Sequence, residues 1–322
     1  GEKGDQINLR FGERIFRGGE LNPLTSVVGQ IKKKRMGGPG APAVAWQSNS
    51  YTIGDTLAHW FTPDFTYHSF RYMEIDGLNY QPKMEDIAGL SIHTNVDQHN
   101  NFSSSSSLIN DIQNMVRRTF LANLVGVQSD CPAREKFGYG GDLNATSPSF
   151  IYNFDMRSFY KKTVYDWVDA INDSTFVDTA PNVGIQYCGI SWESAFLITQ
   201  YQLYLFYNDV DLIRELYPIN TKWMEKVVAL HPKAWVESGL SDHESLSPVP
   251  VELIGTLHYL KSARIMTVFA ELMEDLENKQ KYHQLVIQLE DKLRVAFWDK
   301  SNSGPINRQT LFASLLYHDI IP

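Results

Sequence analysis

Residues 129–142 read SDCPAREKFGYGGD and form the densest cluster of unusual residues in the sequence. The stretch lies between two segments whose apolar residues recur at helical spacing, and its glycines permit tight backbone turns. Loops of this kind hold side chains into a cleft. We therefore expect this loop to hold the functional residues, and the segments before and after it to form the fold that supports them.

The residues before this loop have the pattern of short β-strands. Apolar and polar residues alternate in four segments, at residues 6–11, 43–48, 70–75 and 90–96. Turn signals rich in glycine separate these segments. Short strands with such punctuation predict an antiparallel β-sandwich, which we place at residues 1–102.

Helices are predicted from Leu108 to the end of the sequence. Ser106 or Ser107 is placed to cap the first of them, although the serine run at 103–107 also fits a flexible linker. No strand pattern alternates with the helices, which argues against a βαβ fold. About eight helices are expected, at residues 108–124, 143–153, 155–171, 192–207, 209–230, 249–274, 277–297 and 306–318.

The charged residues of the loop suit the cleavage of a glycosidic bond. A glycosidase needs a protonated carboxyl group for the leaving oxygen, and burial or nearby negative charge raises the pKa of such an acid. The loop places Asp130 and Asp142 on either side of the pair Arg134-Glu135, and an arginine can orient a carboxylate. Judged by spacing alone, an ordinary salt-bridge network is the alternative.

The loop also resembles the signature of glycoside hydrolase family 78, the α-L-rhamnosidases. That signature is Asp-Cys-Pro, then Arg-Glu, then Gly-Trp or Gly-Tyr, then Gly-Asp. The sequence has the same steps in the same order, at 130–132, 134–135, 138–139 and 141–142. The resemblance extends over nearly the whole chain, through residues 4–13, 60–72, 152–155 and 192–193.

The resemblance implies a fold and a reaction. The family has an (α/α)6 barrel after its β-sandwich, which places a barrel domain at residues 103–322, and it removes terminal α-L-rhamnose with inversion. The general acid of the family corresponds to Glu135. Its rhamnose-binding residues correspond to Asp130, Arg134 and Asp142.

The same resemblance implies the walls of a sugar pocket. Tyr139 stands where many members have Trp, so it keeps a flat face and adds a hydroxyl group. Trp192 follows Asp142 by 50 residues, where the family has a pocket Trp. Many members have Asp-Trp in a later loop where this chain has Asp242-His243, and we include both residues as candidates for substrate binding.

No residue of the sequence matches the general base of the family. An inverting glycosidase needs a second carboxylate about 6.5–9.5 Å from the acid. Glu193 and Glu244 are carboxylates in suitable segments, but neither is assigned. About eight helices are also too few for the barrel, so we expect the base to lie beyond Pro322 and residues 1–322 alone to be inactive.

Composition narrows the class of protein further. The net charge of −8 argues against a nucleic-acid surface, and the basic run at 32–35 is interpreted as a solvated loop. No apolar stretch approaches the roughly 18 residues of a membrane span. No metal-ligand or phosphate-loop motif is found, so no metal or organic cofactor is expected. The expected partner is a rhamnose-containing oligosaccharide, polysaccharide or glycoside.

The cysteines and the first residue bear on the compartment. Cys131 and Cys188 are expected to be free buried thiols, with a bridge between them as the alternative. The chain opens at Gly1 without a methionine, so the lack of a visible signal peptide decides little. A periplasmic or secreted protein is favoured over a cytoplasmic one.

Two other functions stay open at this point. A carbohydrate-binding protein that has lost catalysis would keep the fold, but the intact pair Arg134-Glu135 speaks against it. An enzyme of the same barrel fold that acts on another sugar, such as a uronic acid, would favour more cationic residues in the loop than Arg134 and Lys136.

Overall fold

The computed structural model describes residues 1–23, 46–54, 60–173, 175–243, 245–247, 249–298 and 308–321. By their contacts, the residues divide into two compact units. The first comprises Gly1–Asn95 and Asn101–Phe137, and the second comprises Val96–Asn100 and Gly138–Pro322. The basic run at 32–35 and the carboxylate of Glu244 lie outside the described residues.

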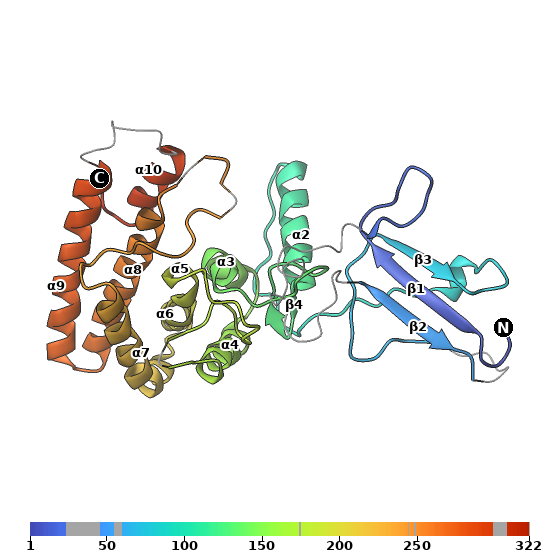
Figure 1. Cartoon of the computed structure of the whole chain (residues 1–322), viewed down its shortest axis with the longest axis horizontal. Helices are drawn as coiled ribbons and strands as arrows, with labels where there is room; N and C mark the ends of the chain where they lie inside the picture. Colours follow the sequence, from blue (N-terminus) through green and yellow to red (C-terminus); the bar gives the residue numbers. More distant parts are fainter. Residues whose placement is uncertain are drawn as a thin grey trace. The chain divides into compact units, whose positions relative to one another are not determined.

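A three-stranded antiparallel sheet is the framework of the first unit (Figure 1). Its order is β2-β1-β3, with β1 at Gln6–Gly12, β2 at Ser48–Thr52 and β3 at Tyr72–Asp76. Leu9 of the central strand pairs with Asn49 on one side and with Ile75 on the other. The alternation of apolar and polar residues therefore predicted β1 and β3 to within a few residues.

Two of the predicted strands differ from the structure. The segment at 90–96 forms no strand, because its backbone hydrogen bonds go elsewhere. The N–H of Thr94 donates to the carbonyl of Leu124 at 2.6 Å, and its hydroxyl accepts from the N–H of Gly126 at 3.0 Å. The segment at 43–48 is described only from residue 46, and β2 begins at its last residue.

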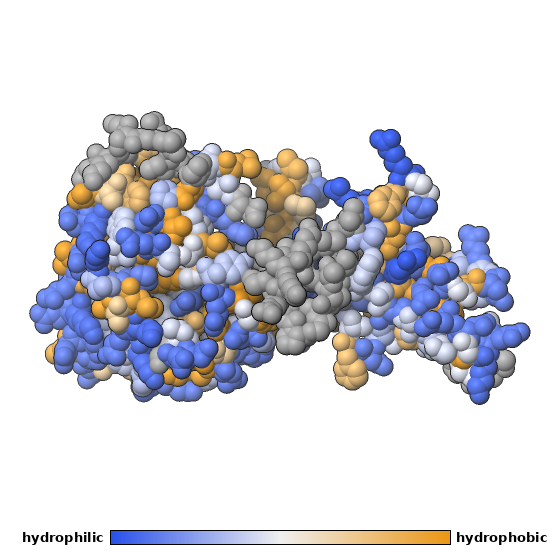
Figure 2. Space-filling view, viewed as in Figure 1, coloured by the Kyte–Doolittle hydropathy of each residue, from blue (hydrophilic) through white to orange (hydrophobic). Residues whose placement is uncertain are grey.

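Helix α2 (Ser107–Ala122) lies in the first unit. Ser106 takes the N-cap position, as predicted, but its side chain makes no capping hydrogen bond. None of the residues of α2 is buried, and Figure 2 shows apolar side chains over this helix. The exposed apolar residues include Leu108, Ile109, Ile112 and Met115. A short hairpin that was not predicted, β4 (Leu124–Val125) and β5 (Val127–Gln128), follows the helix.

Helices build the second unit (Figure 1). They are α3 (Gly140–Asn153), α4 (Arg157–Asp169), α5 (Ile190–Glu193), α6 (Ala195–Tyr207), α7 (Val210–Leu230), α8 (Val251–Leu272), α9 (Leu276–Leu293) and α10 (Arg308–Tyr317). Each predicted helix is present, and the one predicted from residue 192 is divided between α5 and α6. None of the helices in the described part of the chain has the length and apolar character needed to cross a membrane.

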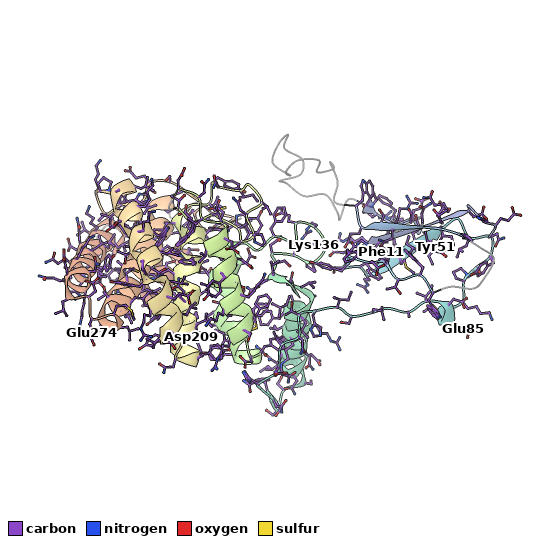
Figure 3. The ribbon with its side chains drawn as sticks, turned by 90° about the horizontal axis from the view of Figure 1, so that it is seen from below. Phe11, Tyr51, Glu85, Lys136, Asp209 and Glu274 are labelled. Carbon is purple, nitrogen blue, oxygen red and sulfur yellow. The ribbon has the colours of Figure 1, made fainter. Side chains whose placement is uncertain are left out.

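Aspartates fix the starts of two long helices. Asp209 precedes α7, and its carboxylate accepts from the N–H of Leu212 at 3.1 Å (Figure 3). Asp275 precedes α9 and accepts from the N–H of Asn278 at 3.0 Å. Both satisfy donors that a helix leaves unpaired in its first turn. The helices therefore begin where the sequence supplies a short acceptor.

Helix α6 lies at the centre of the second unit. It contacts α3, α4, α7 and α8. Its residues 195–200 are all buried, as expected for a helix that neighbours cover on every side. Gln200 of α6 and Asn220 of α7 form a polar pair within this core, and both are 0% exposed. Each side-chain amide donates to the other, at 3.0 and 2.8 Å.

The reciprocal pair predicts a distinctive response to substitution. Asn220→Ala leaves the amide of Gln200 buried with too few partners, so the free energy of unfolding should fall by about 1–3 kcal/mol. Replacing both residues by leucine removes both polar groups and should cost less than the single change. Urea unfolding followed by the helical circular dichroism signal measures both, and a double variant less stable than Asn220→Ala would contradict this account.

Candidate active site

Hydrogen bonds across its base close the first part of the motif loop. The N–H of Asp130 donates to the carbonyl of Phe137 at 3.0 Å, and the N–H of Phe137 donates to the Asp130 carboxylate at 2.9 Å. Inside this closure, the N–H of Glu135 donates to Sγ of Cys131 at 3.2 Å. Arg134 is exposed and Glu135 is half-buried. Arg134 and Glu135 therefore lie in a short loop that its own hydrogen bonds hold closed.

Burial affects the ionisable groups at the base of this loop. It raises the pKa of Asp130, although hydrogen bonds from Cys131 and Phe137 partly offset the rise. Burial also raises the pKa of the Cys131 thiol. Cys131 and Cys188 are both free thiols, as expected, but only Cys188 is buried as predicted, whereas Cys131 is half-buried.

In the second unit, the chain runs from the loop into helix α3. Gly138 accepts from the N–H of Ala180 at 3.0 Å, and the N–H of Gly140 donates to the carbonyl of Asp178 at 2.9 Å. Tyr139, between them, pairs with Thr179 and is only 7% exposed. A short bridge to residues 178–180 therefore fixes the direction in which α3 starts.

The first residues of α3 pack directly on Trp192. A Cβ atom at Gly140 would lie 2.1 Å from the carbonyl oxygen of Trp192, and one at Gly141 would lie 2.4 Å from its indole ring. Real side chains never come so close, so both positions require glycine. Asn144, one turn further along, donates to the carbonyl of Ser191 at 2.9 Å. Asp142 directly follows Gly141 in the same first turn.

The loop that contains Asp242 and His243 also packs beside Trp192. The ring of His243 lies edge-on to the indole of Trp192, with 6.1 Å between centroids. The carboxylate of Asp242 accepts from the hydroxyl of Thr310 at 2.7 Å. The N–H of Leu240 donates to the carbonyl of Cys188 at 2.8 Å, so the backbones of the two loops are joined. The structure thus brings Trp192 and His243 together within the second unit, and Asp142 directly follows Gly141, which packs on Trp192.

Sequence reasoning missed Asp178, which connects the parts of this site. Its carboxylate accepts from the N–H groups of Tyr187 and Cys188 at 2.6 and 2.8 Å, and its carbonyl accepts from Gly140. It is 1% exposed, and burial raises its pKa. Asp178 therefore ties the start of α3 to the segment that leads to Trp192. No local pattern around residue 178 marks it in the sequence.

Glu193, which is half-buried, is a second carboxyl group beside this site. Desolvation raises its pKa to about 7, with a smaller contribution from the negative charge of Asp178. The indole N–H of Trp223 donates to it at 3.5 Å, which favours the ionised form and partly offsets the rise. Trp223 is 1% exposed on α7, so Glu193 is directed toward the helical core. It was considered as a general base from the sequence, and it stays unassigned.

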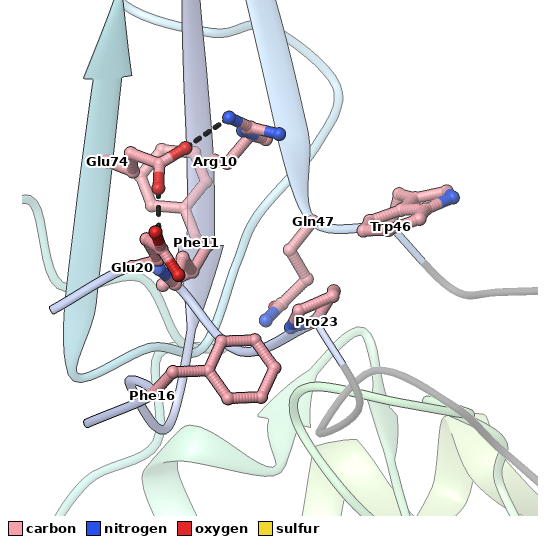
Figure 4. A pocket seen from close by; sticks show the side chains of 9 residues that line it. Arg10, Phe11, Phe16, Glu20, Pro23, Trp46, Gln47 and Glu74 are labelled. Atoms are coloured by element: carbon pink, nitrogen blue, oxygen red, sulfur yellow. Dashed lines mark hydrogen bonds and ion pairs between the residues drawn. The ribbon is translucent and has the colours of Figure 1, made fainter. Parts of the chain in front are cut away.

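A cavity of about 300 Å³ lies elsewhere, in the first unit (Figure 4). Its polar wall is formed by Arg10 and Glu74, which make an ion pair, and the second carboxylate oxygen of Glu74 accepts from the N–H of Leu21. It contains none of the predicted site residues. The full lining is Arg10, Phe11, Phe16, Glu20, Leu21, Pro23, Trp46, Gln47 and Glu74.

Comparison with protein families identifies the larger part of the chain. Residues 97–322 match the bacterial α-L-rhamnosidase six-hairpin glycosidase domain. The chain belongs to this family. Residues 1–93 match the concanavalin-like domain of bacterial α-L-rhamnosidases. These matches confirm the resemblance inferred from the motif loop, and with it a β domain followed by a barrel of helical hairpins.

Individual relatives agree with the family assignment. An α-L-rhamnosidase from Formosa agariphila is 31% identical over 194 residues, which cover 56% of this chain and 20% of that protein. The structure of an α-L-rhamnosidase from Dictyoglumus thermophilum superposes with a TM-score of 0.83 at 28% identity, over 100% of this chain and 36% of that one. The Streptomyces avermitilis α-L-rhamnosidase in complex with L-rhamnose gives 0.84 at 22% identity, over 100% and 30%. This rhamnosidase-family chain thus spans 20% to 36% of the length of these relatives.

The contact between α3 and Trp192 predicts a position-specific cost. Gly141→Ala forces a methyl group into the indole ring, and such overpacking should lower the free energy of unfolding by about 1–3 kcal/mol. Gly89→Ala is the control, because a Cβ there meets nothing within 4 Å. Urea unfolding and tryptophan fluorescence measure both variants. Equal, small effects in the two variants would show that the contact does not constrain the site.

The raised pKa of Glu193 predicts a pH-dependent stability difference. The ordinary value is 4.5 and the value in the fold is about 7, so below pH 4.5 the group is protonated in both folded and unfolded chains. Between these values the unfolded chain ionises first, and stability falls as pH rises. The loss should reach on the order of 3 kcal/mol above pH 7.

Glu193→Gln removes this titration. The variant should match the original protein near pH 4.5 and gain relative stability up to about pH 7, after which the difference should be constant. Urea unfolding at a series of pH values measures the difference. Because other groups titrate in both proteins, the comparison isolates Glu193, and parallel stability curves would contradict the assignment of its pKa.

Proposed function

We propose that the protein is an inverting α-L-rhamnosidase that removes terminal α-L-rhamnose from a polysaccharide or glycoside. The observation that carries the proposal is the loop at 129–142, whose complete family motif occurs in a chain that belongs to the rhamnosidase family. The related Streptomyces avermitilis protein is described in complex with L-rhamnose, which supports the same sugar here.

Glu135 is the general acid in this proposal. It donates its proton to the glycosidic oxygen as the bond to the leaving group breaks. Glu135 is half-buried, within the part of the loop that the hydrogen bonds between Asp130 and Phe137 close. Inversion requires a second carboxylate that activates a water molecule on the opposite face of the sugar. We assign that role to no residue of this chain.

The other motif residues hold the sugar. Asp130, Arg134 and Asp142 supply charged hydrogen-bonding groups, which pair strongly with hydroxyl groups. Asp142 is suited to this role because the packing of α3 on Trp192 fixes its position. Because Asp130 also accepts from the N–H of Phe137, substitution at Asp130 should weaken the loop as well as sugar binding.

Aromatic and polar residues of the second unit are further candidates for contact with the sugar. Trp192 is half-buried, and we propose that the apolar side of a pyranose packs on the exposed part of its indole ring. His243 is exposed beside it and is available to a sugar hydroxyl, whereas Asp242 already accepts from Thr310. Tyr139 is largely covered, so we propose its contact as a narrow edge of the wall.

Substitution of the acid gives the test. In the full-length protein, Glu135→Gln should lower kcat on a natural rhamnoside by about 10²–10⁴-fold, because its leaving oxygen needs a proton. The loss on 4-nitrophenyl α-L-rhamnoside should be clearly smaller, because nitrophenolate leaves with little protonation. Initial rates of rhamnose and nitrophenol release measure the two effects.

The matched control is Glu85→Gln, an exposed glutamate of the same unit that pairs only with Lys83 among the interactions described. It should leave both rates unchanged. Full activity of Glu135→Gln on the natural rhamnoside would exclude Glu135 as the acid. A folded, full-length protein that hydrolyses neither substrate would exclude the rhamnosidase itself.

A further inference from the structure

Lys136, which directly follows Glu135, has an uncommon backbone conformation. Its φ angle is 58°, in the left-handed region that residues with a side chain rarely adopt. Such a conformation persists only where the surroundings hold it in place, and it often does so beside a functional residue.

A single residue of the same unit, Tyr67, receives the Lys136 side chain in two ways. The ammonium group donates to the carbonyl oxygen of Tyr67 at 2.7 Å, and it lies 4.0 Å from the centre of the Tyr67 ring. Lys136 is half-buried within the first unit (Figure 3), and desolvation lowers its pKa. The cation–π contact and the hydrogen bond both favour the charged form and so oppose the effect of desolvation.

Tyr67 is attached to the sheet through its neighbours. His68, the next residue, hydrogen-bonds to Asn49 of β2 at 2.6 Å, and its ring stacks on Phe11 of β1 with 4.6 Å between centroids. Ser69 and the side chain of Gln47 exchange two hydrogen bonds, both 2.8 Å long. The acceptor for Lys136 is therefore part of a rigid framework.

Residues of the motif loop also affect the pKa of the Tyr67 hydroxyl. Its pKa is raised first by burial and then by Cys131 and Asp130. These are the residues whose hydrogen bonds close the loop around Glu135. The ring of Tyr67 thus faces the loop that its carbonyl helps to anchor.

We propose that Lys136 and Tyr67 form a clamp that positions the general acid. By holding the main chain immediately after Glu135 to the β-sheet, the clamp sets the direction in which the carboxyl group offers its proton. Lys136 is a positioning residue, because it acts through Glu135 without contacting the sugar. The inference rests on the proposed role of Glu135, and it gives the β domain a part in catalysis.

The first arm of the test reports on the loop without any activity. Lys136→Met keeps most of the aliphatic stem and removes the charge and its donors. Hydrogen exchange of the backbone amides at 130–137, followed by mass spectrometry, should be faster by about tenfold or more in this variant. Lys136→Arg should restore slow exchange, because a guanidinium group also donates to a carbonyl and stacks on a ring. Lys83→Met, at an exposed ion pair of the same unit, is the control.

The second arm uses the full-length enzyme and two substrates. Lys136→Met should lower kcat on a natural rhamnoside by about 10- to 100-fold, with KM changed by less than about 3-fold, because a displaced acid transfers its proton poorly. The rate on 4-nitrophenyl α-L-rhamnoside should fall by less than about 3-fold. Tyr67→Leu, which keeps the carbonyl and removes the ring, should give a smaller loss of the same kind and serves if the lysine variant does not fold.

The outcomes separate the clamp from the proposed function. A loss confined to the natural rhamnoside, with faster exchange and rescue by arginine, supports the clamp. Equal losses on both substrates, unchanged exchange, or an arginine variant that behaves like methionine would overturn it. If the original protein hydrolyses neither substrate, the rhamnosidase proposal fails, while the exchange arm still decides whether Lys136 anchors the loop.

Discussion

The site in the second unit depends on the close packing of a helix start against one indole ring. Gly140 and Gly141 leave no room for a Cβ atom between α3 and Trp192, so the helix axis and the ring have one relative position. This contact also fixes the backbone position of Asp142, because Asp142 follows Gly141 in the first turn of α3. The two glycines therefore fix the start of α3 against Trp192, and we propose that Trp192 and Asp142 both contact the sugar.

Two carboxyl groups, those of Asp178 and Glu193, lie beside this contact and differ in the hydrogen bonds that they accept. Two backbone N–H groups satisfy the Asp178 carboxylate, so its burial contributes order to the loops. Among the described residues, Glu193 accepts one long hydrogen bond, from Trp223, and burial raises its pKa to about 7. Ionisation of such a glutamate destabilises the folded protein, and carboxyl groups with strongly shifted pKa values occur most often near functional sites. In the first unit, the left-handed backbone conformation of Lys136 is likewise unfavourable, and it lies directly beside Glu135.

Local signals made much of this predictable. Helical periodicity located the helices of the second unit, and the motif loop located the candidate site, because both depend on residues close in sequence. Alternation failed at residues 90–96, since an extended segment that bonds to Leu124 has the same local pattern as a strand. Asp178 and the Lys136–Tyr67 contact were not predictable, because their partners lie about ten and 69 residues away and no spacing rule connects them.

The central claim is that this site cleaves α-L-rhamnosides with inversion, and the configuration of the first product tests it most directly. Proton NMR spectra recorded during the early reaction of the full-length protein with an α-L-rhamnoside distinguish the two anomers before they interconvert. If the enzyme inverts, β-L-rhamnose appears first and the α anomer forms later by mutarotation. Initial release of α-L-rhamnose would contradict inversion and with it the assignment of Glu135 as an acid that works with a separate base.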